Sequence, residues 1–287
     1  MNSPNPPVRH HYIPEFYLKN WCQRQEDNRL VEYKRPGPGQ PVHSAFKYPK
    51  QVGFEKDLYT IPEFDPDLRT WIEDQFMGQV DSYAAQIQQV MIQGKSTLSH
   101  EDQVHWARFM ISLIHRNPEK VDFLRNSWKK IYSEGQNAFR PPLPEGLRDI
   151  SEDIYTKMEA GEFVRLFTRI IDNEKVGTTL LNMSWHVLDI HKGDLLTSDR
   201  PIFRSKSLTE KHAFMALSLN PKRLLLLVNR RNTFDKIISH WDKIASDYNN
   251  AIVRQSCNYV YGSHINHKRF IENRLGYGSP QFIGGSH

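Results

Sequence analysis

The chain has few cysteines and no long hydrophobic run. Its 287 residues include only Cys22 and Cys257, too few for the disulfide framework that stabilises small secreted domains. No stretch of about 18 consecutive apolar residues occurs, so a transmembrane helix is not expected. Residues 1–8 are polar and proline-rich and lack the apolar core of a secretory signal. We therefore expect a cytoplasmic protein without a membrane partner.

The sequence also lacks the short signatures of several large enzyme classes. It contains no GxxxxGK(S/T) phosphate loop, no GxGxxG fingerprint, no HExxH motif, no GxSxG elbow and no CxxC pair. Nucleoside triphosphatases, dinucleotide-dependent oxidoreductases, zinc peptidases and elbow-type hydrolases therefore lose support. No organic cofactor is indicated.

Charge of one sign is not concentrated anywhere in the chain. The net charge is +5, from 38 Lys and Arg against 33 Asp and Glu, which permits weak attraction to phosphate-rich partners. The basic residues are scattered, and short pairs such as Lys129-Lys130 are typical of solvated faces. Nucleic acid is a candidate partner that charge alone does not select.

The hydrophobic pattern changes period twice along the chain. Residues 30–34 and 57–61 predict two short strands that could pair with each other. From residue 68 to residue 171, apolar side chains recur at steps of three and four, which predicts helices. Within this region Ser99 is the expected N-cap of one helix, and Pro118 interrupts the next apolar stripe.

Strands return in the last third of the chain. Residues 224–228 are apolar on both faces, which favours a central, covered strand. Residues 233–252 predict one further helix, and 259–261 a last short strand. The segregated order favours an α+β fold, with a largely helical middle and a small mixed or antiparallel sheet built from N- and C-terminal strands. We expect one domain over 1–287, with 66–182 as a helical subdomain or insertion.

The most informative segment is His10-His11-Tyr12-Ile13-Pro14. Imidazole can act as a base, an acid or a metal ligand near neutral pH. Pro14 biases the residues before it toward an extended backbone, so the two histidines should point to opposite sides. We expect one to face the interior and His11 to face a cleft, near the start of a helix at Pro14. A purely structural hydrogen-bonding role remains the alternative.

Two acidic residues, Asp199 and Glu73, lie close to apolar residues in the sequence. Asp199 follows Thr197 and Ser198 at the end of an apolar run, where it could accept from an imidazole, hold a cation or cap a turn. Glu73 follows Ile72 at the edge of a helical stripe, so it faces a cleft or forms a surface ion pair.

Several stretches in a fixed order carry a family resemblance. They are His10 to Trp21, Asp57-Leu58-Tyr59, Ile72-Glu73, Arg116-Asn117-Pro118, Thr197 to Pro201 and Ala216 to Pro221. With them the chain resembles the DUF4238 family of uncharacterised microbial proteins. The His-His-x-x-Pro opening and the Ser-Asp-x-Pro element are the specific parts, whereas Ala216 stands where the family usually has proline. The resemblance implies a soluble microbial protein and brings no catalytic residue with it.

These observations predict one shared site, in which the two histidines lie beside Asp199. The expected catalytic residues are His10, His11 and Asp199. A divalent cation such as Mg²⁺ or Mn²⁺ would be held by Glu73 and Asp199. Tyr59 and Ser198 are the expected supporting residues.

Two functions fit these residues. One is metal-dependent, nuclease-like cleavage of phosphodiester bonds, with histidine as general base or ligand. The other is a non-catalytic module that binds nucleic acid or a protein partner, in which the His-His run is structural. An enzyme requires the histidines and at least two carboxylates to converge on one open pocket, whereas a binding module requires a continuous basic surface.

Overall fold

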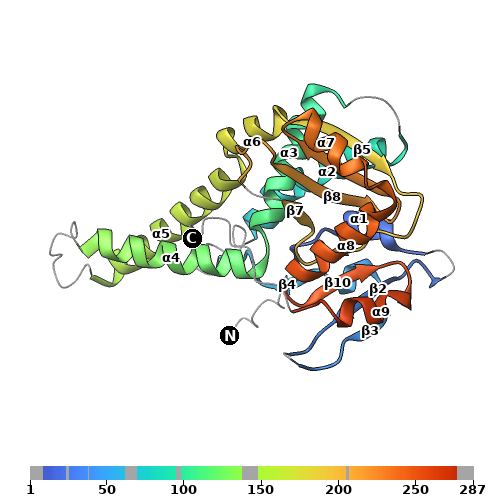
Figure 1. The fold of residues 1–287 in the computed structure, drawn as a ribbon. Coiled ribbons are helices and arrows are strands. Elements are labelled where there is room, and N and C mark those ends of the chain that lie inside the picture. Colours follow the sequence, from blue (N-terminus) through green and yellow to red (C-terminus); the bar gives the residue numbers. More distant parts are fainter. Residues whose placement is uncertain are drawn as a thin grey trace.

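A computed structural model of the chain describes residues 9–23, 26–37, 39–61, 70–94, 98–137, 148–204 and 207–276. The fold is α+β, as predicted, and every pair of strands within these ranges is antiparallel (Figure 1). In the part of the chain described, no helix is both long and apolar enough to cross a membrane.

One four-stranded sheet joins the two ends of the chain. Its strands, in spatial order, are β3 (His43–Lys47), β2 (Leu30–Lys34), β10 (Tyr259–Gly262) and β6 (Thr197–Ser198). Tyr261 of β10 pairs with Glu32 on one side and with Thr197 on the other. The helix α9 (Lys268–Glu272) contributes Ile271 to the core on this sheet. The prediction that N-terminal and C-terminal strands meet is confirmed.

The predicted strand at 57–61 is wrong. The chain instead forms a strand just before it, β4 (Phe54–Lys56), which pairs with β1 (Arg9–His11) rather than with β2. Asp57 then adopts a left-handed backbone with φ of 53°, and this ends the strand. Residues 57–59 therefore form a turn that brings Tyr59 against β1.

A second four-stranded sheet is covered on both faces. Its order is β5 (Ser184–Asp189), β9 (Arg223–Val228), β8 (Phe214–Asn220) and β7 (Ile202–Arg204). In β9, Leu225 and Leu227 pack into the core shared with the helical middle, whereas Leu224 and Leu226 pack toward the C-terminal helices. The predicted covered strand at 224–228 is confirmed.

The middle of the chain is helical. The elements in order are a π-helix η5 (Ile72–Met77), α2 (Gly78–Ile92), α3 (His100–His115), α4 (Pro118–Asn137), α5 (Arg148–Ile171) and α6 (Glu174–Leu181). Ser99 caps α3, with its hydroxyl accepting from the amide of Asp102 at 3.0 Å. Figure 1 shows α4 and α5 projecting from the rest of the fold. The helical middle as a separate subdomain stays a prediction.

The predicted single helix at 233–252 is two helices. α7 (Arg231–Ile238) ends at Ser239, a 3-10 turn occupies Trp241–Lys243, and α8 (Ile244–Gln255) follows. His240 leaves the helical region with φ of −107° and ψ of 36°, which breaks the continuous hydrogen-bond ladder. Both helices lie over the face of the second sheet that carries Leu224 and Leu226 (Figure 1).

Candidate functional site

The His-His segment forms β1 and is followed by a short helix. Pro14 is the N-cap of α1 (Glu15–Leu18), with an extended backbone at φ of −62° and ψ of 145°. The alternation expected of an extended segment is present, since His10 is buried and His11 retains 17% exposure of its side chain. The strand therefore presents one imidazole to the core and the other to its edge.

His10 is fixed by Tyr59. The backbone amide of Tyr59 donates to His10 Nδ1 at 2.8 Å, and the two rings stack with centroids 5.4 Å apart. Because Nδ1 accepts, the neutral ring carries its proton on Nε2. Burial lowers the pKa of His10, although Asp57 and Asp74 oppose the shift. The buried Nε2 has no hydrogen-bond partner among the residues described, so it is a free donor.

Arg116 places an under-paired cation in the same region. It follows α3 at the C-cap position, and its side chain is fully buried. Its Nη1 pairs with Asp81 of α2 at 2.8 Å, and its carbonyl accepts from the hydroxyl of Tyr59 at 2.7 Å. Within the described ranges, Nε and Nη2 have no partner. A buried guanidinium with two unused nitrogens is suited to bind an anion.

Glu73 lies on the π-helix, an element often found at functional sites. Burial raises its pKa to about 7, while Arg116 and a hydrogen bond from the backbone amide of His11 oppose the shift. Its Oε2 atom is buried, and the described part of the chain offers it no hydrogen-bond partner. Glu73 therefore carries a proton for a substantial fraction of the time at neutral pH.

His11 completes the group. Burial lowers its pKa, Glu15 opposes this at 3.7 Å from Nε2, and the charges of Arg116 and Arg9 lower it further. At neutral pH the ring is therefore mainly uncharged, and the usual order of the two pKa values is reversed, since that of Glu73 lies above that of His11. Environments that separate two pKa values in this way are typical of acid–base pairs.

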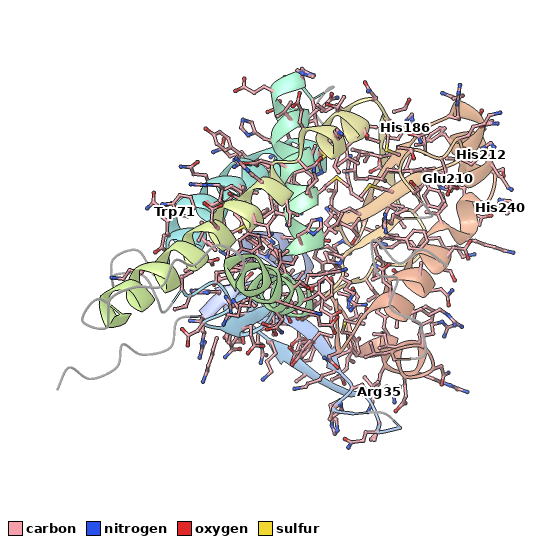
Figure 2. The ribbon with its side chains drawn as sticks, turned by 90° about the vertical axis from the view of Figure 1, so that its left-hand side faces the viewer. Arg35, Trp71, His186, Glu210, His212 and His240 are labelled. Carbon is pink, nitrogen blue, oxygen red and sulfur yellow. The ribbon has the colours of Figure 1, made fainter. Side chains whose placement is uncertain are left out.

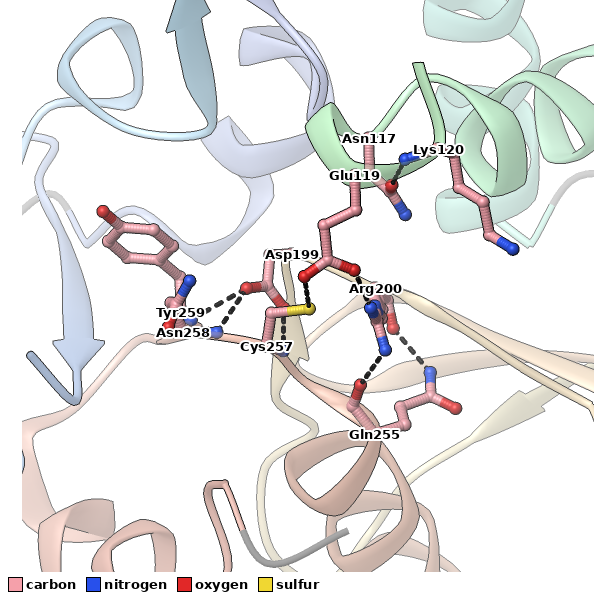
Figure 3. Close-up of polar contacts among 9 residues, drawn as sticks. All are labelled: Asn117, Glu119, Lys120, Asp199, Arg200, Gln255, Cys257, Asn258 and Tyr259. Atoms are coloured by element: carbon pink, nitrogen blue, oxygen red, sulfur yellow. Dashed lines mark hydrogen bonds and ion pairs between the residues drawn. The ribbon is translucent and has the colours of Figure 1, made fainter. Parts of the chain in front are cut away.

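Asp199 belongs to a different network, drawn in Figure 3. Its carboxylate accepts from the backbone amides of Cys257 at 3.0 Å, Asn258 at 2.7 Å and Tyr259 at 3.0 Å. Burial raises its pKa to about 6, against the effect of these amides. Ser198 accepts from the amide of Arg200 at 3.1 Å. These contacts hold Asp199 to the bend between α8 and β10, which lies 58 to 60 residues away in the sequence, rather than to its own turn.

The charged residues around Asp199 hold α4 against the ends of β6 and β10 in the first four-stranded sheet. Glu119, in the first turn of α4, accepts from the thiol of Cys257 at 2.9 Å and pairs with Arg200 (Figure 3). Arg200 also donates to the carbonyl of Gln255. Lys120 lies on the next position of α4, where the charges of Arg200 and Arg204 add to burial in lowering its pKa.

The structure thus links four of the expected site residues, whereas Asp199 and Ser198 take part in a separate hydrogen-bond network. His11, Tyr59 and Glu73 lie around Arg116, and His10 joins them through Tyr59. We call these five residues with Asp81 the Arg116 cluster. No hydrogen bond or ion pair of Asp199 or Ser198 within the described residues reaches this cluster. Three or more His, Cys, Asp or Glu side chains placed to hold one metal ion do not occur in the part of the chain that is described.

Sequence reasoning did not select Arg116 or Asp81 as site residues. Arg116 stands in the Arg-Asn-Pro stretch, directly after the last turn of an amphipathic helix. A charged residue in that position is usually solvated, and only the packing of Tyr59 and α2 around it makes it buried. The signal was the family resemblance rather than any periodicity.

The comparison with known families gives one match. Residues 9–265 match the family described as "Protein of unknown function (DUF4238)". The chain belongs to the DUF4238 family. The matched range contains the whole Arg116 cluster and the Asp199 network. No curated protein and no solved structure shows significant similarity to the chain.

Proposed function

We propose that this DUF4238 protein is a phosphodiester-cleaving, nuclease-like enzyme whose active site is the Arg116 cluster. The observation that carries the proposal is the buried guanidinium of Arg116, which has Nε and Nη2 unpaired beside a carboxyl group with a pKa of about 7. A phosphate diester is an anion that a guanidinium can bind through two parallel hydrogen bonds. Its cleavage requires one proton to be removed and one to be donated.

The pKa directions assign the two proton transfers. A mainly uncharged His11 accepts the proton of the attacking hydroxyl, and protonated Glu73 donates a proton to the leaving oxygen. Arg116 binds the non-bridging oxygens, and the free Nε2–H of His10 donates to the charge that develops there. Asp81 and Tyr59 are positioning residues, since they contact Arg116 and His10 rather than the substrate.

RNA is the favoured substrate. Its 2′-hydroxyl lies next to the phosphate, so the nucleophile is already in place. In the proposed step this oxygen bonds to phosphorus, the bond from phosphorus to the 5′-oxygen breaks, and the products are a 2′,3′-cyclic phosphate and a free 5′-hydroxyl. Substrate would enter from the partly exposed side of His11 and Glu15, and this side must open for a phosphate to reach the buried nitrogens of Arg116.

A divalent cation is the other route to the same products. Glu73 could contribute one oxygen to Mg²⁺ or Mn²⁺, with substrate phosphate and water completing the shell. The ligands expected from the sequence for this cation also included Asp199. Both of its carboxylate oxygens already accept hydrogen bonds from backbone amides. The proposal therefore assigns the proton transfers to side chains and tests the cation separately.

Cleavage assays test the proposal. The substrates are fluorescently labelled RNA and DNA, each single-stranded and double-stranded, in buffers that contain EDTA, Mg²⁺ or Mn²⁺. We expect RNA cleavage in EDTA that falls at least about a hundredfold in Glu73→Gln and in His11→Asn, the size typical of a lost acid or base. Glu55→Gln and His43→Asn are matched controls on exposed strand positions. If none of the substrates is cleaved in any of these buffers, the proposed enzymatic activity is wrong.

One observation favours a second candidate, a non-catalytic nucleic-acid-binding module. Burial and the charges of Arg200 and Arg204 lower the pKa of Lys120, and burial and the charges of Lys120 and Arg204 lower the pKa of the neighbouring His115 to about 4. Such a cationic group suits a phosphate backbone. Salt-dependent oligonucleotide binding that Arg204→Gln weakens, in a protein that cleaves nothing, would select this candidate.

A further inference from the structure

A cavity of about 610 Å³ lies between the second sheet and the two helices that follow it. Its floor is the face of the sheet formed by β7, β8 and β9, and its walls are one side of α7 and one side of α8. The break between α7 and α8 at His240 allows the two helices to diverge over the sheet. The volume is in the range of small-molecule sites.

The floor of the cavity has no free polar group. Phe203, Phe214, Leu224 and Leu226 line it with apolar side chains. Tyr248 of α8 is the polar exception, but its hydroxyl already accepts from the amide of Ser218 at 2.8 Å, and its one proton has the carbonyl of Pro201 and the hydroxyl of Ser218 within reach. A ligand that enters must therefore have an apolar body, because a polar group on the floor would remain unpaired.

The mouth of the cavity is polar and is lined by one lysine, one aspartate and two histidines. Lys236 comes from α7, His240 from the break after α7, His212 from the segment before β8, and Asp247 from α8. Figure 2 shows His212 and His240 on the same side of the molecule. In the ranges described, the ammonium of Lys236 makes no hydrogen bond or ion pair, and His212 binds only the hydroxyl of Thr233, at 3.2 Å.

We infer that this cavity is a second ligand site, which takes an amphipathic carboxylate with its aliphatic chain on the floor and its head group beside Lys236. An unpaired ammonium at the edge of an apolar cavity favours an anionic head over a neutral one and repels a cationic one. The cavity shares no residue with the Arg116 cluster, so this inference does not depend on the proposed nuclease activity.

Calorimetric titration of three ligands with the same chain length tests the head-group preference: decanoate, decanol and decyltrimethylammonium, each below its micelle concentration. We expect decanoate to bind with a single stoichiometric site and the cationic ligand not to bind. Octanoate should bind about fifteenfold more weakly than decanoate, because it lacks two methylenes and each buried methylene contributes roughly a fourfold change in affinity. Saturable binding of the cationic ligand as tight as that of decanoate would overturn the head-group assignment.

Two variants locate the site. Lys236→Gln should weaken decanoate about tenfold, and Lys243→Gln, an exposed lysine on the 3-10 turn that does not line the cavity, should leave it unchanged. Ala251→Trp places an indole from α8 into the cavity and should abolish binding. Thermal melting of each variant confirms that the fold is retained. Decanoate binding to a folded Ala251→Trp protein with unchanged affinity, or no saturable binding to the parent, would contradict the inference.

Discussion

The hydroxyl of Tyr59 donates to the backbone carbonyl of Arg116 at 2.7 Å, across fifty-seven residues of sequence. The backbone amide of the same tyrosine donates to His10. One residue in the turn after β4 therefore positions an imidazole on one side and the end of α3 on the other. This connection brings β1 and the C-terminus of α3 together.

Removing the Tyr59 hydroxyl should destabilise the protein. Tyr59→Phe leaves the Arg116 carbonyl without its buried donor, and we expect the free energy of unfolding to fall by about 1–2 kcal/mol. Urea unfolding measures the change. Tyr83→Phe is the control, because Tyr83 is 48% exposed and should alter stability by only a few tenths of a kcal/mol. Equal effects of the two substitutions would contradict the buried role of the Tyr59 hydroxyl.

Arg116 should be needed for stability as well as for binding phosphate. Arg116→Ala leaves Asp81 without its partner, and we expect a loss of about 3 kcal/mol in urea unfolding. Arg165→Ala removes half of an exposed pair with Glu162 and should cost less than about 0.5 kcal/mol. If Arg116→Ala unfolds at the same urea concentration as the parent, the guanidinium of Arg116 does not form a buried ion pair with Asp81.

The raised pKa of Glu73 predicts how stability depends on pH. Its folded pKa of about 7 exceeds its ordinary value of 4.5, so its contribution is fully present below pH 4.5 and is lost as the pH rises through 7. Glu73→Gln removes this dependence. Relative to the parent, the variant should therefore gain stability between about pH 4.5 and 7, by at most about 3 kcal/mol.

Parallel urea titrations of the two proteins at pH 5, 6, 7 and 8 measure this difference. The histidines act in the opposite direction in both proteins, because their lowered pKa values give stability that is lost on acidification, and their effect cancels in the comparison. A difference that does not change over this range would show that Glu73 is solvated.

Asp199 should affect stability rather than turnover. Asn cannot accept from all three amides that converge on Asp199, so Asp199→Asn should lower the free energy of unfolding by about 2–3 kcal/mol. At a temperature where the variant remains folded, its cleavage rate should stay within about threefold of the parent. A loss as large as that of Glu73→Gln in a fully folded variant would restore Asp199 to the active site.

Periodicity in the sequence predicted the covered strand and the cap at Ser99, because burial on both faces and a capping hydroxyl are local signals. The alternation of His10 and His11 followed from Pro14 in the same way. These features depend on residues close together in the chain.

Features decided by distant contacts could not be predicted. The turn at 57–59 depends on a left-handed Asp57, which aspartate tolerates without requiring it. The break at His240 interrupts an apolar stripe that continues in register on both sides. Burial of Arg116 arises only when Tyr59 and Asp81 close over the end of α3. The sequence selected the histidines and Glu73 as candidate site residues, which stays a prediction, but it did not select Arg116, whose charge acts on His11 and Glu73.

The pH dependence of RNA cleavage in EDTA tests the central claim most directly. With a neutral histidine as base and a protonated Glu73 as acid, kcat/KM should rise on an acid limb below pH 6.5 and fall on a basic limb near pH 7. Glu73→Gln should be at least about a hundredfold slower and should lose the basic limb, while Glu55→Gln retains both. A basic limb that persists unchanged in Glu73→Gln would contradict the assignment of Glu73 as the acid.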